Sequence, residues 1–272
     1  MDDFRLKVFI TAARTLSFTR AAGQLDISQP AVSKHVAELE TRYGLQLFTR
    51  RGSRLEYEMS LCTGQTEGEL RLGASTTIAQ YLLPPILARF AARFPQVRVS
   101  LLSGNSGQVE QALGDHAIDL GLVESVSRRQ GLHYTLFRPD ELVLVARPGG
   151  KYARTESVTP EALCRIPLVL RENGSGTLEV ISAALAERGI RLPQLNVVLR
   201  LGSTEGIKRF VRHSDAMAIV SAFSVVDELR SGTLRIVDLD GLPLLRDFVF
   251  VHAEAHPARL VRQFLDFARN DL

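Results

Sequence analysis

The chain has 272 residues, a formal net charge of +3 at pH 7 and 45% hydrophobic residues. This length predicts about two domains, each large enough for its own hydrophobic core. No apolar run reaches the roughly 18 residues needed to span a bilayer, and the acidic N-terminus "MDDFRLKVF" lacks a secretory signal. Cys62 and Cys164 lie far apart, which favours free thiols in a reducing compartment. We therefore expect a cytoplasmic protein without a disulfide.

The first sixty residues predict three short helices. The segment "FRLKVFITAARTLSF" places its apolar residues mostly on one helical face. Ser17 is a good N-cap for a second helix, "FTRAAGQL". Ser28 is the expected cap of a third helix, with Pro30 in the first turn, where its missing N–H does no harm. The inward stripe of this third helix consists of Val32, Val36, Leu39 and Tyr43.

The outer face of the third helix carries small or hydrogen-bonding side chains: Gln29, Pro30, Ser33, Lys34 and Thr41. Short side chains allow close approach to a DNA major groove, and Gln, Ser and Lys can reach base edges and phosphates. The segment "GLQLFTRRGSRLEYE" then predicts a strand, a basic turn and a strand. This wing would offer Arg50, Arg51 and Arg54 to backbone phosphates. The spacing alone does not distinguish such a DNA-binding domain from a small helical domain whose outer face only contacts solvent.

The residues themselves carry more information than their spacing. The stretch "SFTRAAGQLDISQPAVSKHVAELETRYGLQLFTR" closely resembles the DNA-binding domain of LysR-type transcriptional regulators. The resemblance implies a winged helix-turn-helix over residues 1–57 that binds double-stranded DNA, at an imperfect inverted repeat, as a dimer. It places Gln29, Pro30, Ser33 and Lys34 in the major groove and lets Thr19 and Ser28 hold the helix on the phosphates. His35, in the same helix, is explained by phosphate contact or by solvation.

Residues 69–272 predict alternating strands and helices, which is typical of a parallel sheet with right-handed crossovers. The first helix, "TTIAQYLLPPILARFAARFP", is expected to have an internal Pro-Pro kink. The pattern resembles the effector-binding half of LysR-type regulators, an α/β fold of two lobes that periplasmic solute-binding proteins share. We expect the first lobe over about 69–140 and 246–272, and the second over about 141–245.

Three predicted strands end in hydroxyl-rich helix starts, and ligands of open α/β sheets bind beyond the carboxyl ends of strands. The three starts are Ser75-Thr76-Thr77, Ser175-Gly176-Thr177 and Ser203-Thr204. Each one alone is explained as a helix cap. Together, their free N–H groups and helix dipoles favour a small anion. The family resemblance makes the cleft between the lobes the inducer site, with these residues at its usual positions.

Four further residues follow strands or lie at strand ends. Asn105 and Ser106 could join the same cleft, and so could Glu124, although a hinge hydrogen bond explains Glu124 at least as well. Arg171 could bind a carboxylate through two parallel hydrogen bonds. An ion pair with Glu172 or Glu205 is the favoured interpretation of Arg171.

Catalytic and metal-binding patterns are absent from the sequence. There is no GxSxG, Walker or HExxH motif and no GxGxxG after a strand. The six His residues show no ligand spacing. We therefore expect neither an enzyme nor a metal or cofactor site.

The segment between the two predicted domains is unusually short. In LysR-type regulators a long linker helix follows the wing, pairs with its partner's copy and sets the separation of the recognition helices. Residues 58–68, "EMSLCTGQTEG", could form at most about two helical turns, and Gly64 and Gly68 oppose a helix. The resemblance therefore predicts a regulator that has lost several linker turns.

The expected protein is a LysR-type transcription regulator that responds to a small, anionic effector between its lobes. We expect a homodimer or homotetramer assembled through the effector domain. The alternative is an effector-binding sensor whose DNA binding is impaired by the short linker.

Overall fold

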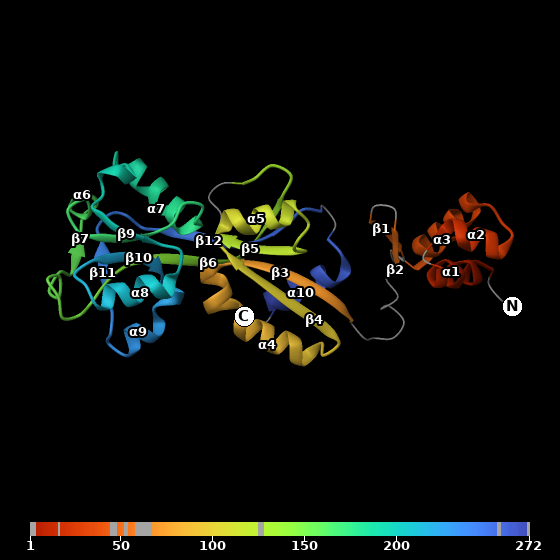
Figure 1. Ribbon diagram of the computed structural model, residues 1–272, viewed down its shortest axis with the longest axis horizontal. Coiled ribbons are helices and arrows are strands. Elements are labelled where there is room, and N and C mark those ends of the chain that lie inside the picture. The colour runs from red at the N-terminus through yellow and green to blue at the C-terminus, as the bar shows by residue number, and fades with distance from the viewer. Residues whose placement is uncertain are drawn as a thin grey trace. The chain divides into compact units, whose positions relative to one another are not determined.

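A computed structural model describes residues 4–15, 17–43, 48–51, 54–57, 67–124, 128–254 and 257–270. The chain divides into two compact units, Met1–Glu67 and Gly68–Leu272 (Figure 1). The predicted short linker falls largely on residues 58–66, which lie outside the described residues. Its length and conformation therefore stay a prediction.

The first unit is a three-helix domain followed by a two-stranded hairpin, as the sequence predicts. Ser17 accepts a hydrogen bond from the backbone N–H of Arg20 at 3.3 Å, and Ser28 accepts one from Ala31 at 3.3 Å. Both serines therefore stabilise helix starts. The elements are α1 (Phe4–Thr15), α2 (Phe18–Leu25), α3 (Gln29–Tyr43) and the antiparallel pair β1 (Phe48–Arg51) and β2 (Arg54–Tyr57).

The buried core of this unit comes from one face of each helix. Val32, Val36 and Leu39 of α3 are buried and pack with side chains of α1 and α2. Phe48 of β1 closes the core, with its ring centroid 5.2 Å from that of Phe18. Burying these three residues leaves the opposite face of α3 at the surface, and the side chain of Tyr43, the fourth residue of the predicted stripe, lies outside the described residues.

The second unit is built on one twisted sheet. Its strand order among the described residues is β4-β3-β5-β12-β6-β10-β8-β9, with β11 beside β6 and β7 beside β11. The strands are β3 (Gly68–Ser75), β4 (Val97–Gly104), β5 (Leu120–Glu124), β6 (His133–Ala146), β7 (Ser157–Val158), β8 (Leu168–Arg171), β9 (Val197–Leu201), β10 (Met217–Ser221), β11 (Arg235–Leu239) and β12 (Leu245–His252).

Strands β6 and β12 join the two halves of this sheet. The antiparallel pair spans Leu245 to His252 of β12, while the last part of β6 pairs with β10 and β11. The sequence pattern predicts only the last part of β6, "LVLVA", because Arg138, Pro139, Asp140 and Glu141 interrupt the apolar pattern before it. We call the half with β3, β4 and β5 the first lobe and the half with β7 to β11 the second lobe.

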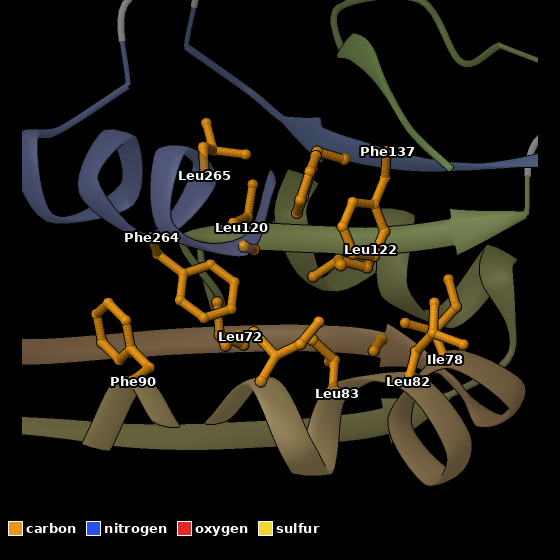
Figure 2. Close-up of a cluster of buried hydrophobic side chains, with 14 of the residues drawn as sticks. Leu72, Ile78, Leu82, Leu83, Phe90, Leu120, Leu122, Phe137, Phe264 and Leu265 are labelled. Atoms are coloured by element: carbon orange, nitrogen blue, oxygen red, sulfur yellow. The ribbon is translucent and has the colours of Figure 1, made fainter. Parts of the chain in front are cut away.

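Helices cover both faces of each lobe (Figure 1). In the first lobe, Phe90 of α4 and Phe264 of α10 meet edge to face with centroids 5.1 Å apart (Figure 2). The helices are the π-helix η1 (Ile78–Leu82), α4 (Leu83–Arg93), α5 (Ser106–Gly114), α6 (Pro160–Leu163), α7 (Gly176–Glu187), the 3-10 turns η2 (Leu192–Gln194) and η3 (Ala222–Ser224), α8 (Thr204–Arg212), α9 (Val226–Arg230) and α10 (Arg259–Asn270).

The predicted first helix is continuous from Thr76 to Arg93, and Pro84 and Pro85 lie inside it as expected, directly after an irregular, π-helical turn. Among the described residues, no helix is long and apolar enough to cross a membrane.

Candidate functional site

The outer face of α3 presents the polar residues expected to meet DNA. Pro30 and Lys34 are exposed, and Gln29 donates from Nε2 to Ser33 Oγ at 2.9 Å. This contact holds the amide and the hydroxyl together near the helix N-terminus. Thr19 of α2 is also exposed.

His35 lies on a different side of α3 from Lys34. Its ring packs edge to face against Phe4 of α1 at 5.6 Å, and its Nδ1 lies 3.9 Å from Glu38 Oε2. The structure therefore places His35 against α1.

The β1–β2 hairpin brings the expected basic residues to its turn. Arg51 pairs in register with Arg54, and Arg50 pairs with Leu55. The side chains of these residues lie outside the described part of the structure.

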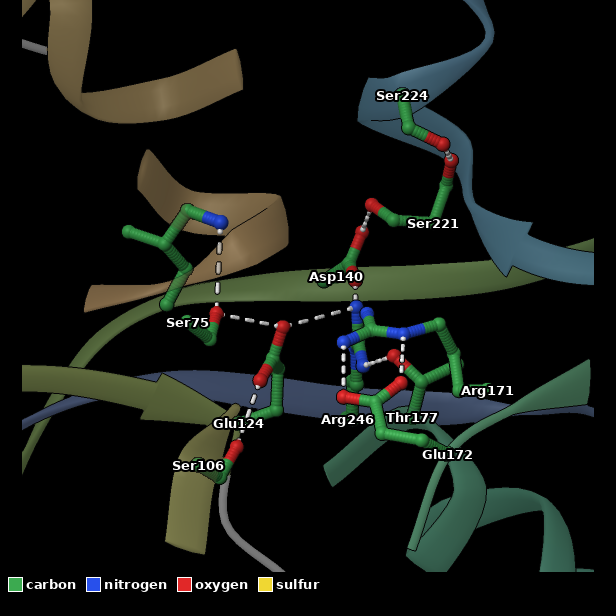
Figure 3. Close-up of polar contacts among 11 residues, drawn as sticks. Ser75, Ser106, Glu124, Asp140, Arg171, Glu172, Thr177, Ser221, Ser224 and Arg246 are labelled. Atoms are coloured by element: carbon green, nitrogen blue, oxygen red, sulfur yellow. Dashed lines mark hydrogen bonds and ion pairs between the residues drawn. The ribbon is translucent and has the colours of Figure 1, made fainter. Parts of the chain in front are cut away.

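Glu124 is the centre of a buried polar network between the lobes. Its two carboxylate oxygens accept hydrogen bonds from Ser75 Oγ at 2.8 Å and Ser106 Oγ at 2.9 Å (Figure 3). Glu124 therefore makes the structural hydrogen bonds that the sequence left as an alternative. Ser75, Ser106 and Glu124 were all expected to contact an effector, and they lie together here. The hydroxyls of the two serines donate to the carboxylate of Glu124.

We call β6 and β12, which join the two lobes, the hinge strands. Arg246 of β12 connects the Glu124 network to Asp140 of β6 and to Thr177 of the second lobe (Figure 3). Its Nε lies 2.6 Å from Asp140 Oδ2, and its Nη1 donates to Thr177 Oγ1 at 2.8 Å. Its Nη2 lies 3.7 Å from Glu124 Oε1 and makes no hydrogen bond with any described residue. The side chain of Arg246 is only 1% exposed, so this one donor is buried and unused.

Asp140 and Arg246 form an ion pair inside the protein. Asp140 also accepts a hydrogen bond from Ser221 Oγ at 2.7 Å. Burial raises the pKa of Asp140 above its usual value, although Arg246 and Ser221 act in the opposite direction.

Sequence reasoning missed both Arg246 and Asp140. The segment "LRDFVFV" contains a signal for a buried charge. Arg246 lies on the same side of the strand as Phe248 and Phe250. Both phenylalanines are completely buried. A cation that alternates with buried aromatic residues predicts a buried partner of opposite charge.

Arg171 makes the ion pair that the sequence favoured. Its Nε and Nη2 donate to the two oxygens of Glu172 at 2.8 and 2.9 Å. Burial raises the pKa of Glu172, but the Arg171 guanidinium, together with hydrogen bonds from the Glu172 backbone and from Asn105, lowers it by more. This arginine is therefore already satisfied within the second lobe.

The start of α7 packs directly against the end of β5. A Cβ atom on Gly176 would lie 2.4 Å from the carbonyl oxygen of Glu124. Beside it, the N–H of Gly107 donates to Gly174 O at 3.2 Å, and Asn105 Nδ2 donates to Asn173 O at 3.4 Å. The two lobes are therefore in contact along this side.

The remaining residues expected to bind an effector lie at helix starts, and only some of them cap a helix. Ser203 caps α8 by accepting from the N–H of Gly206 at 3.2 Å, and Thr204 beside it is buried. Ser175 is buried but makes no side-chain cap at α7. Thr77 is buried, and Thr76 Oγ1 is buried with no hydrogen-bond partner in the described structure. No described contact links Ser203 or Thr204 to the Glu124 network.

A separate groove of about 470 Å³ lies in the second lobe. Lys151, Tyr152 and Arg165 are among its lining residues. It is open and contains none of the expected effector residues. The described residues include no group of three or more His, Cys, Asp or Glu side chains that could hold a metal ion.

Comparison with known proteins agrees with this architecture in both units. Residues 4–59 match the family described as "Bacterial regulatory helix-turn-helix protein, lysR family", and residues 63–272 match the "LysR substrate binding domain". The uncharacterized HTH-type transcriptional regulator YeiE of Escherichia coli is 33% identical over 283 residues, covering 97% of this chain and 95% of that protein. The HTH-type transcriptional activator CmpR of Synechocystis is 27% identical, covering 97% and 93%.

A solved structure is similar to the second unit. The CcmR regulatory domain of Synechocystis, in complex with 2-PG, has a TM-score of 0.68 and 27% identity, covering 75% of this chain and 97% of that chain. The chain belongs to the LysR family of transcription regulators. It accordingly has a winged helix-turn-helix for DNA and a two-lobe domain for a small-molecule effector.

Proposed function

We propose that this regulator reads an inverted-repeat operator with α3 and the β1–β2 wing, and that a small anionic effector held between its lobes changes this binding. It acts in the cytoplasm, without catalysis, as a homodimer or homotetramer assembled through the effector domain. Each effector-induced change requires different affinities for at least two arrangements of the protein.

The unused donor of Arg246 is the observation that carries the effector proposal. A buried polar group without a hydrogen bond costs about 1–3 kcal/mol, so a ligand oxygen that accepts from Nη2 recovers that cost. Ser75 donates to the same Glu124 oxygen that lies 3.7 Å from Nη2. Its neighbour Thr76 has the second unsatisfied buried group in this region. The uncapped first turn of α7, next to Thr177, adds free N–H groups that favour an anion.

The charge of the network limits where the anion can bind. Glu124 and Asp140 are two carboxylates near one guanidinium. Because Ser75 and Ser106 already donate to Glu124, an effector oxygen can take the free Nη2 donor without leaving that carboxylate unpaired. Two carboxylates beside one guanidinium make the network itself negative. We therefore place a hydrogen-bond-accepting oxygen of the effector at Arg246, its anionic group at the uncapped first turn of α7 beside Ser175, and a further polar group at Thr76.

The DNA part of the proposal is tested with the full-length chain and the region upstream of its own gene. Lys34→Ala should weaken binding about five- to tenfold and reduce the slope of log affinity against log salt by about one, because one phosphate or base contact is lost. Lys7→Ala is the matched control. Lys7 is an exposed lysine of α1 in the same unit, and its removal should change affinity much less. Fluorescence anisotropy at several salt concentrations measures both variants.

Equal effects of Lys34→Ala and Lys7→Ala would contradict the assignment of α3 to the major groove. A salt-independent affinity for the cognate site would contradict DNA reading altogether.

We propose that the short linker makes it harder for the two DNA-binding units of a dimer to bind their half-sites at the same time. The two family matches leave only residues 60–62 between them, and the alignment with YeiE is longer than the whole chain, 283 against 272 residues. Residues of that relative therefore have no counterpart here. We expect little gain in affinity from a second half-site, because avidity needs a linker that lets both units bind at once. Tight, cooperative binding to the full palindrome would contradict this expectation.

A further inference from the structure

A second polar contact joins the lobes, apart from the Glu124 network. Tyr81 lies on η1 of the first lobe, and its hydroxyl donates to Glu205 Oε1 in the first turn of α8. The Nζ of Lys208, also on α8, lies 4.9 Å from the centroid of the Tyr81 ring. One first-lobe side chain therefore meets a carboxylate and an ammonium group of the second lobe.

The second-lobe side of this contact is complete without Tyr81. Lys208 Nζ lies 2.7 Å from Glu205 Oε1, 2.9 Å from Glu228 Oε1 and 2.7 Å from Ser224 O. All three donors of the ammonium group thus have partners inside the second lobe. Tyr81 adds a hydroxyl and an aromatic face to a site that is already assembled, so it can leave and return.

The charges of this site favour a hydroxyl donor. Two carboxylates, Glu205 and Glu228, surround one ammonium group, and the side chain of Lys208 is only 5% exposed. Burial raises the pKa of Glu205, but the hydrogen bonds from Lys208 and Tyr81, together with the charges of Lys208 and Arg209, lower it by more. Burial and then Glu205 raise the pKa of Tyr81, so the phenol keeps its proton at physiological pH. An ionised acceptor thus faces a permanent donor, which is a strong kind of hydrogen bond.

The position of the contact relates it to the effector site. Tyr81 lies on the first helical turns after Ser75 and Thr76, and Glu205 directly follows Thr204. The hydrogen bond from Gly107 to Gly174 is a separate contact between the lobes.

We propose that the Tyr81–Glu205 contact is a reversible fastening between the lobes, which holds them closed and shifts the balance between open and closed arrangements of the effector domain. Breaking it makes the closed arrangement rarer and reduces the affinity of any ligand that prefers closure. That last consequence rests on the effector site proposed above, whereas the fastening itself does not.

Hydrogen exchange on the full-length protein without any ligand tests the fastening. Tyr81→Phe keeps the ring and removes only the hydroxyl, and Glu205→Gln keeps the shape and removes only the charge. Each variant should speed exchange about fivefold in both segments 76–83 and 203–209, because a hydrogen bond to a charged group is lost across the lobes. In segment 76–83 the double variant should equal either single variant, because both substitutions weaken the same contact with Tyr81. In segment 203–209 Glu205→Gln should have an additional effect, because it also removes the ion pair of Glu205 with Lys208.

Tyr134→Phe is the matched control. The Tyr134 hydroxyl donates to Glu110 Oε1 at 2.9 Å, and both residues belong to the first-lobe side of the sheet. This variant should leave exchange in segment 203–209 unchanged. The proposal is overturned if Tyr81→Phe speeds exchange only in segment 76–83, or if the effects of the two single variants on segment 76–83 multiply. Should Tyr81→Phe fail to fold, Glu205→Gln alone decides the question by its effect on segment 76–83.

Discussion

Replacing Arg246 by Met should destabilise the effector domain by about 3–5 kcal/mol, because the change leaves buried carboxylates without their counter-charge. Asp140 and Glu124 are 4% and 3% exposed, so water cannot replace the guanidinium. Methionine retains much of the apolar stem of arginine, which separates the loss of charge from a loss of volume. Urea unfolding of the full-length chain, followed by circular dichroism, measures the change.

The loss should be smaller at pH 5 than at pH 8. Even beside Arg246, burial raises the pKa of Asp140. An acid with a raised pKa in the folded state favours folding as the pH falls, because the folded state binds more protons. Without Arg246 this effect grows, and protonation at low pH removes the unpaired charge.

The control for this substitution is Arg71→Met. Arg71 pairs with Asp119 at 2.6 Å, and the two side chains are 36% and 12% exposed, so water reaches this pair far more than it reaches Arg246. Ion pairs that water reaches contribute about 1 kcal/mol or less, so this variant should lose much less stability than Arg246→Met. Equal losses for Arg246→Met and Arg71→Met would contradict the view that the Arg246 network holds the hinge strands and both lobes together.

Gly176→Ala should separate the start of α7 from the end of β5. The added Cβ would lie 2.4 Å from Glu124 O and 2.9 Å from Ser106 Oγ. The first of these atoms belongs to the backbone of a buried strand and cannot rotate away. Overpacking of this kind costs about 1–3 kcal/mol, and we expect the lobes to relieve it by opening. The amide of Gly107, which donates to Gly174 O, should then exchange faster.

Gly107→Ala is a strict comparison for this experiment. Gly107 belongs to the same inter-lobe contact, but a Cβ there would have no neighbour closer than 3.6 Å. It lies in α5, where alanine has the better helix propensity. The alanine variant should therefore be as stable as the unmodified chain or slightly more stable. A destabilisation equal to that of Gly176→Ala would show that steric contact with Glu124 is not the cause.

The DNA-binding unit was the most predictable part of the molecule, because its signals are local. Ser17 and Ser28 act within three residues of their own position, and the spacing of Val32, Val36 and Leu39 alone defines the buried face of α3. The alternating strands and helices of the second unit were predictable for the same reason.

Signals between distant residues were not predictable from one sequence. Arg246 contacts Asp140, which is 106 residues away in the sequence, and Tyr81 contacts Glu205, which is 124 residues away. Nothing in the local pattern of either residue names its partner. The convergence of Ser75 and Ser106 on Glu124 could be anticipated from strand ends, but the direction of the hydrogen bonds could not. Two hydroxyls expected to face an effector donate to Glu124 instead.

Hydrogen exchange of the full-length protein with a panel of small carboxylates and phosphates tests the proposed effector site most directly. Compounds that raise the melting temperature are selected first, since a ligand that binds the folded state stabilises it. We predict that such a compound slows exchange together at the helix starts after Ser75 and Ser175, and that Arg246→Lys weakens its binding about tenfold or more. A stabilising anion that protects only the second-lobe groove lined by Lys151, Tyr152 and Arg165 would contradict it.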